Sequence, residues 1–168
     1  MHHTSNELND LADREDSLLS QLPTHAVGTE LGQVERTYRA IHTRYVSLAV
    51  SGSLEALKRA LFLQWFSCCE PPWLTGLGKL DPKGARQLML WLDALSVLEQ
   101  RDSELASMLA YYQSVAAYCF ESYPTDNLIA WFESPSGRTD LPTSVCLLSK
   151  SSRGQMGVYW ASVAKRWT

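Results

Sequence analysis

The sequence lacks the motifs that mark the common enzyme classes. It contains no P-loop, no dinucleotide-binding GxGxxG, no HExxH metal motif and no GxSxG nucleophile elbow. None of its four histidines follows a glutamate by three residues, so the Glu-x-x-His pairs of a di-metal carboxylate bundle are missing as well. These absences favour a protein that is not an enzyme and that uses no metal and no cofactor.

Cysteines and long apolar runs are also scarce. The four cysteines, Cys68, Cys69, Cys119 and Cys146, form no CxxC pair, and free thiols are typical of a reducing compartment. Cys68 and Cys69 fall in an apolar segment and are expected to be small buried side chains. No apolar run reaches the roughly 18 residues that span a bilayer, and no basic and apolar leader opens the sequence. We therefore expect a cytoplasmic protein without a membrane span.

The net charge of −3 is unevenly distributed. Residues 1–22 hold five acidic side chains against the single Arg14, whereas residues 150–168 hold four basic side chains and no acidic one. A net negative charge disfavours binding to a phosphate backbone, and the basic end has no run of consecutive charges. Nucleic-acid binding is therefore not expected.

Apolar positions recur at helical spacing through most of the chain, most clearly over residues 29–50. The other predicted helices cover residues 54–69, 82–98, 103–123, 125–134 and 155–167. A hairpin is the alternative for the last of them, and a short apolar run at residues 144–148 is ambiguous. The pattern predicts an all-α, single-domain bundle of five to seven helices.

The predicted helix over residues 54–69 is apolar on nearly every side. Leu57, Leu61 and Trp65 share one stripe, while Phe62 lies on a second face. Other helices must surround such a helix, so we expect it at the centre of the bundle. The pair Glu55 and Arg59 lies one turn apart at its N-terminal end, which we expect to be exposed.

Residues 1–28 read as an acidic, partly helical N-terminal arm that precedes a helical domain of residues 29–168. Apolar spacing is poor between Leu11 and Leu18, where acidic residues fill the gap. This pattern predicts either a helix docked by its C-terminal half or a partly disordered arm.

The loop of residues 70–78, EPPWLTGLG, is the most unusual segment. Its prolines stiffen the backbone, and its glycines permit tight turns or close approach to another group. Trp73 is a candidate binding anchor, because tryptophan is enriched at binding hot spots. The favoured alternative is that Trp73 and Leu74 fold back as a lid on the helix ends, because a loop tryptophan usually packs somewhere.

A second unusual segment covers residues 153–160, where two glycines flank Gln155 and Met156. We predict that this segment meets the loop of residues 70–78, with Arg153 paired to Glu70. No catalytic residue is predicted, since His42 lies on the polar face of its helix and is expected to be solvated. The candidate binding residues are Glu70, Trp73, Thr75, Arg153, Gln155 and Tyr159.

Two functional hypotheses follow. The first is a non-catalytic cytoplasmic protein that acts by binding another protein, as an adaptor, a regulator or an immunity-type partner. The second is a small-molecule binder or enzyme with a pocket between residues 70–78 and residues 153–160. A concave pocket lined by the candidate residues favours the second hypothesis, and a flat apolar patch favours the first.

Overall fold

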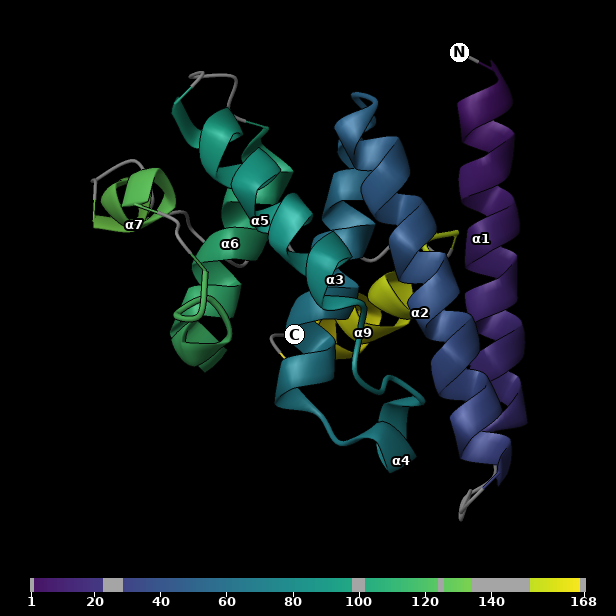
Figure 1. The fold of residues 1–168 in the computed structure, drawn as a ribbon. Helices are drawn as coiled ribbons and strands as arrows, with labels where there is room; N and C mark the ends of the chain where they lie inside the picture. Colours follow the sequence, from purple (N-terminus) through teal and green to yellow (C-terminus); the bar gives the residue numbers. More distant parts are fainter. Residues whose placement is uncertain (1, 23–28, 98–101, 124–125, 134–151, 167–168) are drawn as a thin grey trace.

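The fold is known from a computed structural model, which describes residues 2–22, 29–97, 102–123, 126–133 and 152–166 (Figure 1). Within these ranges the protein contains eight α-helices and one 3-10 turn, and no strand. The predicted all-α, single-domain fold is confirmed. The helix count exceeds the expected five to seven because the loop of residues 70–78 contains a single helical turn, α4 (Pro72–Thr75).

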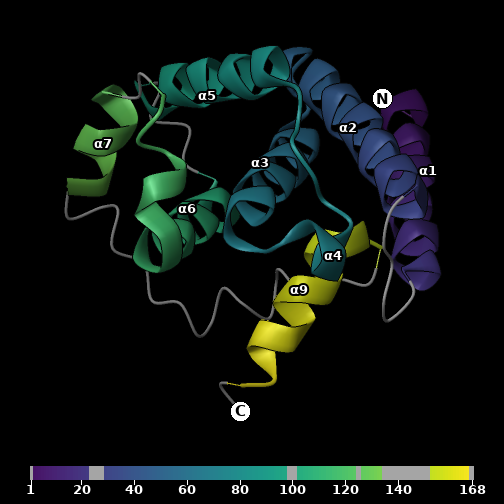
Figure 2. The same ribbon diagram turned by 60° about the horizontal axis from the view of Figure 1, so that its bottom comes forward.

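Helix α3 (Leu54–Cys69) lies at the centre of the bundle. Every residue from Ala56 to Trp65 is buried, and α2, α5, α6 and α9 pack around it (Figure 2). Its start is set by Ser53, whose hydroxyl oxygen accepts a hydrogen bond of 3.3 Å from the backbone N–H of Ala56. The predicted central helix is therefore confirmed in both position and extent.

Helices α1 (His2–Gln21) and α2 (Thr29–Val50) run side by side along one edge of the molecule (Figures 1 and 2). Helix α1 buries Leu8, Leu11 and Leu18, so its packed face extends well beyond its C-terminal half. It contacts both α2 and α9. The N-terminal segment is thus a packed helix over residues 2–21.

Helix α5 (Pro82–Val97) begins at the predicted position, where an oxygen of Asp81 accepts a hydrogen bond of 2.8 Å from the N–H of Gly84. Helix α6 (Ser103–Ala116) is capped in the same way by Asp102. The prediction of one continuous helix to residue 123 is wrong. At Ala116 the backbone turns to φ −154° and ψ 65°, which interrupts the helix before a 3-10 turn, η1 (Ala117–Cys119).

Helices α7 (Asp126–Glu133) and α9 (Gly154–Ala164) complete the described fold. Both were predicted, and α9 settles the choice between helix and hairpin in favour of the helix. The apolar run at residues 144–148, with Cys146, lies outside the described residues. No helix in the described ranges has the length and apolar character needed to cross a bilayer.

Candidate functional site

The two unusual segments of the sequence do meet, through Gln155 and Thr75. The side-chain amide of Gln155 donates a hydrogen bond of 3.1 Å to the backbone carbonyl of Thr75, and both residues are buried. Tyr159, one turn further along α9, is half-buried and shares a hydroxyl hydrogen bond of 2.8 Å with Tyr111 of α6. Residues Thr75, Gln155 and Tyr159 therefore hold α4 and α6 to α9 rather than presenting a surface.

The predicted pairing of Arg153 with Glu70 is wrong. Arg153 donates from Nε and Nη2 to the carboxylate of Glu55, at 2.8 and 2.6 Å, and from Nη1 to Glu104. Glu55 lies in the first turn of α3 and Glu70 follows its last turn, so roughly 22 Å of helix separates them. All three guanidinium nitrogens are used at the opposite end of α3 from Glu70.

These contacts belong to a buried ion-pair network at the N-terminal end of α3. Lys58 lies 2.8 Å from an oxygen of Asp102 and also contacts Glu104, while Arg59 binds Glu55 and the carbonyl of Leu8. Lys58 and Arg59 are 5% and 4% exposed, so the expectation that the Glu55–Arg59 pair is exposed is wrong for Arg59, whereas the side chain of Glu55 is 31% exposed. Helices α1, α6 and α9 cover that end.

The network is electrostatically satisfied. Burial opposes ionisation of Glu55, but hydrogen bonds from Arg153 and Arg59 outweigh it and hold the pKa of Glu55 below its ordinary value. The Arg153 guanidinium is charged for the same reason, because Glu55 and Glu104 raise its pKa despite burial. Because its charges are partnered, the network ties α3, α6 and α9 together.

Glu15 is a second buried ionisable group, and the sequence analysis missed it. Its side chain is 1% exposed; one carboxylate oxygen accepts 2.7 Å from the hydroxyl of Tyr45 and the other 3.0 Å from the N–H of Gln155. A Cβ on Gly154, at φ +56°, would lie 2.7 Å from the Glu15 carboxyl carbon, so this close approach requires glycine. The carboxyl group therefore caps the start of α9 from α1.

Burial raises the pKa of Glu15 to about 7, against the lowering effects of the Tyr45 hydroxyl, the Gln155 N–H and the Arg59 charge. The sequence contains a signal that the side chain of Glu15 is buried. Glu15 stands four residues after Leu11 and three before Leu18, on the same helical stripe, so it fills the apparent gap in the apolar spacing.

His42 is buried, contrary to the expectation that it would be solvated. It is 0% exposed, and neither ring nitrogen forms a well-aligned hydrogen bond with any described residue. Burial lowers the pKa of His42 to about 4, with weaker opposing effects of the Asp81 charge and of the nearby backbone of Ala60. The spacing indicates why: His42 follows Tyr38 by four residues and precedes Tyr45 by three, and both tyrosines are fully buried.

The three described cysteines lie at the C-terminal end of α3 and in η1. Cys69 and Cys119 have their sulfur atoms 3.7 Å apart, whereas Cys68 is exposed, so the expectation that Cys68 is buried is wrong. Burial raises the pKa of both Cys69 and Cys119, which keeps them as protonated, poorly nucleophilic thiols. In the described ranges no group of three His, Cys, Asp or Glu side chains is arranged to hold a metal ion.

Trp73 and Leu74 do not form the lid that the sequence favoured. They are 68% and 64% exposed, whereas Thr75 and Leu77, immediately after them, are 3% and 0% exposed. The single turn α4 directs the first pair outward and the second pair onto the core. The loop closes the core with Thr75 and Leu77, and its tryptophan remains on the surface.

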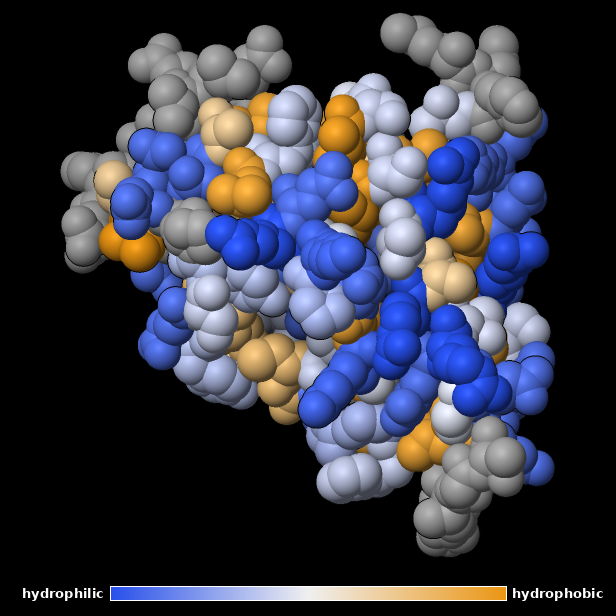
Figure 3. Space-filling view, in the orientation of Figure 1, coloured by the Kyte–Doolittle hydropathy of each residue, from blue (hydrophilic) through white to orange (hydrophobic). Residues whose placement is uncertain are grey.

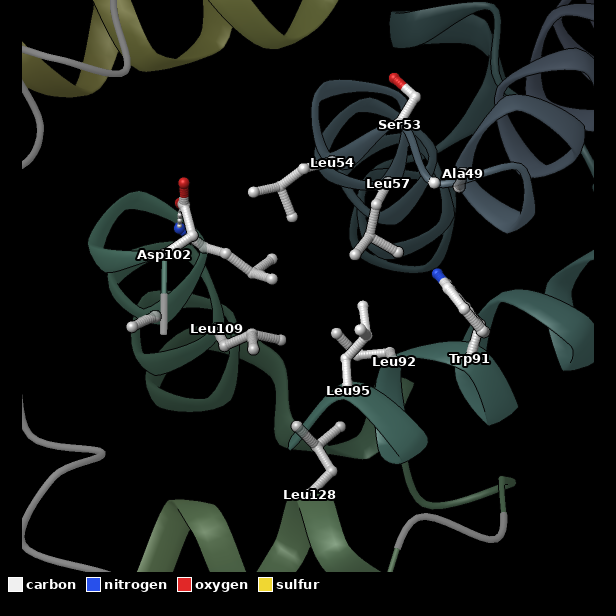
Figure 4. A pocket seen from close by; sticks show the side chains of 13 residues that line it. Ala49, Ser53, Leu54, Leu57, Trp91, Leu92, Leu95, Asp102, Leu109 and Leu128 are labelled. Carbon is white, nitrogen blue, oxygen red and sulfur yellow. Dashed lines mark hydrogen bonds between the residues drawn. The ribbon is translucent and has the colours of Figure 1, made fainter. Parts of the chain in front are cut away.

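An apolar pocket of about 300 Å³ opens elsewhere, between α3, α5, α6 and α7 (Figure 4). None of the six candidate binding residues lines it. Its inner wall consists of leucine side chains that Figure 4 shows pointing toward one another from these four helices. A volume of this size lies at the lower end of the range for small-molecule sites.

The face seen in Figure 3 carries mostly hydrophilic residues, and hydrophobic ones appear there as small separate spots. This face therefore does not show the broad apolar patch that would mark a large protein interface. No protein-family model, curated protein or solved structure matches the chain. The exposed Trp73–Leu74 turn and the apolar pocket are the two features of the described residues that are suited to binding another molecule.

Proposed function

We propose that this is a non-catalytic, cytoplasmic protein that acts by binding another protein, with Trp73 and Leu74 as the anchor of the interface. The observation that carries the proposal is the exposure of these two adjacent large apolar side chains, at 68% and 64%. Burying a tryptophan and a leucine against a partner removes a large apolar area from water, and tryptophan is among the residues most enriched at interface hot spots.

The backbone beneath this anchor is fixed before binding. Gly76, at φ +75°, ends the turn, and its N–H donates a hydrogen bond of 2.7 Å to the carbonyl of Pro72. The carbonyl of Thr75 accepts from Gln155, and the hydroxyl of Thr75 accepts 3.1 Å from the N–H of Leu77. A turn held at both ends loses little conformational entropy on binding, which favours affinity.

Gly76 also fixes the turn to the rest of the bundle. A Cβ at Gly76 would lie 2.7 Å from a methyl carbon of Val34 and 3.1 Å from the ring of Tyr38, so the backbone rests directly on α2. Because the turn packs directly on α2, the anchor presents a defined shape to a partner. This arrangement supports recognition rather than catalysis, since the exposed pair contributes no titratable group.

The proposal is tested by affinity capture from lysate of the native host cells, followed by purification of the captured partner and measurement of its Kd. We expect Trp73→Ala to weaken the purified complex by about 30-fold or more, which corresponds to roughly 2 kcal/mol. Leu74→Ala is expected to weaken it in the same direction by a smaller factor.

Matched controls are Tyr118→Ala and Val158→Ala, which truncate side chains that are 55% and 57% exposed on other elements. These variants are expected to leave the Kd unchanged. A partner that binds Trp73→Ala as tightly as the native chain, or that is lost equally with Tyr118→Ala, refutes the assignment of the anchor.

A further inference from the structure

The apolar pocket between α3, α5, α6 and α7 separates polar from apolar groups by depth. Its buried floor is aliphatic, made by Leu57, Leu92, Leu105, Leu109 and Leu128 among others. Its polar side chains, Ser53, Trp91 and Asp102, are all partly exposed and therefore belong to the rim. A molecule that fills the pocket must bury an apolar part and keep its polar part outside, since the described residues of the floor offer no side-chain hydrogen-bonding group.

The floor is held in place by contacts outside the pocket. Asp93 of α5 accepts hydrogen bonds of 2.8 and 2.9 Å from the side chain of Asn127 and the N–H of Leu128, and so fixes the start of α7. This contact positions Leu128 at the base of the pocket in Figure 4. The cavity is therefore built from helices that are already tied together.

The charge at the rim restricts the head group of a ligand. Among the described residues that line the pocket, Asp102 is the one charged side chain. Burial opposes its ionisation, but the hydrogen bond from Lys58 and those from the backbone of α6 hold the pKa of Asp102 below its ordinary value. Asp102 is therefore an anion at neutral pH. Its partner Lys58, 2.8 Å away, does not line the pocket, so a carboxylate inside the pocket meets the charge of Asp102 first and is disfavoured.

We propose that this pocket binds a single-chain amphiphile whose tail packs on the floor leucines and whose neutral or cationic head lies at the rim near Asp102. The head can donate a hydrogen bond to Asp102 or accept one from the ring N–H of Trp91, which lines the same rim. Ser53 supplies a further hydroxyl at the same rim. This site is independent of the Trp73–Leu74 turn.

Three probes with the same chain length test separately whether the pocket binds the tail and whether its rim discriminates between head groups. Isothermal titration calorimetry at about pH 7 compares the affinities of 1-octanol, octylamine and octanoate, which differ mainly in their head groups. We expect octanol and octylamine to bind with a stoichiometry of one, and octanoate to bind roughly tenfold more weakly or worse. Failure of both octanol and octylamine to bind refutes the site.

Asp102→Asn tests the role of the charge while keeping a good helix cap, because asparagine caps as well as aspartate. We expect octanoate binding to rise by roughly tenfold in this variant, with octanol binding changed by less than about threefold. Octanoate that binds the native chain as tightly as octanol, or that does not respond to Asp102→Asn, overturns the assignment of the head group.

Ala106→Leu tests the location, because Ala106 lines the pocket and a leucine there fills part of it. Ala40→Leu is the matched control, since it adds the same atoms at an exposed position of α2 outside the pocket. We expect the first variant to weaken octanol binding by about tenfold or more and the second to leave it unchanged. Equal octanol affinity in both variants, with cooperative unfolding of each, places the bound probe elsewhere and refutes the site.

Discussion

Replacing Glu15 by glutamine removes a buried titratable group while keeping its length and shape. The carboxyl group lies among Tyr38 and Tyr45 of α2, Arg59 of α3 and the first turn of α9, with Asp16 next to it on α1. Because burial raises its pKa from the ordinary 4.5 to about 7, the folded protein binds this proton more tightly than the unfolded chain does.

The direction and the size of the effect of pH on stability follow from this difference between the folded and unfolded pKa of Glu15. The contribution of Glu15 to stability is full below about pH 4.5 and is lost as the pH rises to 7. Each pKa unit corresponds to about 1.36 kcal/mol, so the total loss is about 3 kcal/mol. The free energy of unfolding of the native protein, minus that of Glu15→Gln, should fall by this amount between pH 4.5 and pH 8.

The comparison with the variant is needed because the titration of His42 changes the stability with pH in the opposite direction. Its folded pKa of about 4, below the ordinary 6.5, stabilises the fold above pH 6.5 and loses that effect as the pH falls toward 4. The two groups partly cancel in the native protein, whereas the difference between native and Glu15→Gln isolates Glu15.

Urea unfolding followed by far-UV circular dichroism at half-unit pH steps gives both curves. A difference that stays flat across this range, or that rises with pH, refutes the reasoning. A rising difference means that Tyr45, the Gln155 N–H and Arg59 outweigh burial and lower the pKa of Glu15 instead.

Three further substitutions test separate features. His42→Leu should abolish the loss of stability between pH 6.5 and 4 that the buried histidine causes, as seen in urea unfolding at both ends of that range. Gly154→Ala should cost about 2 kcal/mol or more, because its Cβ meets Glu15, whereas Gly52→Ala, with open space around a φ of +100°, should cost about 1 kcal/mol of backbone strain. Leu61→Ala should cost about 2–5 kcal/mol, and a value near zero contradicts the central position of α3.

Much of the fold was predictable because apolar periodicity reports which helix face is buried. Helix α2 and helix α3 appear with almost the expected bounds, and the signal at Asp81 and Pro82 marks the start of α5. The errors arose where a polar residue occupies a position on a buried stripe. Glu15 and His42 both do so: residue type alone makes Glu15 part of an acidic gap in the apolar spacing, and it predicts that His42 is solvated.

The candidate site was less predictable because it depends on contacts between distant segments. The sequence correctly brings the start of α9 to the loop after α3, through Gln155 and Thr75. The sequence cannot show that Arg153 lies at the N-terminal end of α3 and not beside Glu70 at its C-terminal end, because that depends on the direction in which α9 crosses the bundle. The pocket arises from leucines on four helices, which look like ordinary core residues one helix at a time.

The most direct test of the account compares two tryptophans that stand eight residues apart. Trp65 is 1% exposed and stacks on Tyr112 with ring centroids 4.4 Å apart, whereas Trp73 is 68% exposed. Trp65→Ala should lower the free energy of unfolding by about 3–5 kcal/mol relative to the native chain. Trp73→Ala, measured under the same conditions, should lower it by less than about 0.5 kcal/mol. A large loss for Trp73→Ala would mean that this side chain packs on the core, and it would contradict the proposed binding anchor.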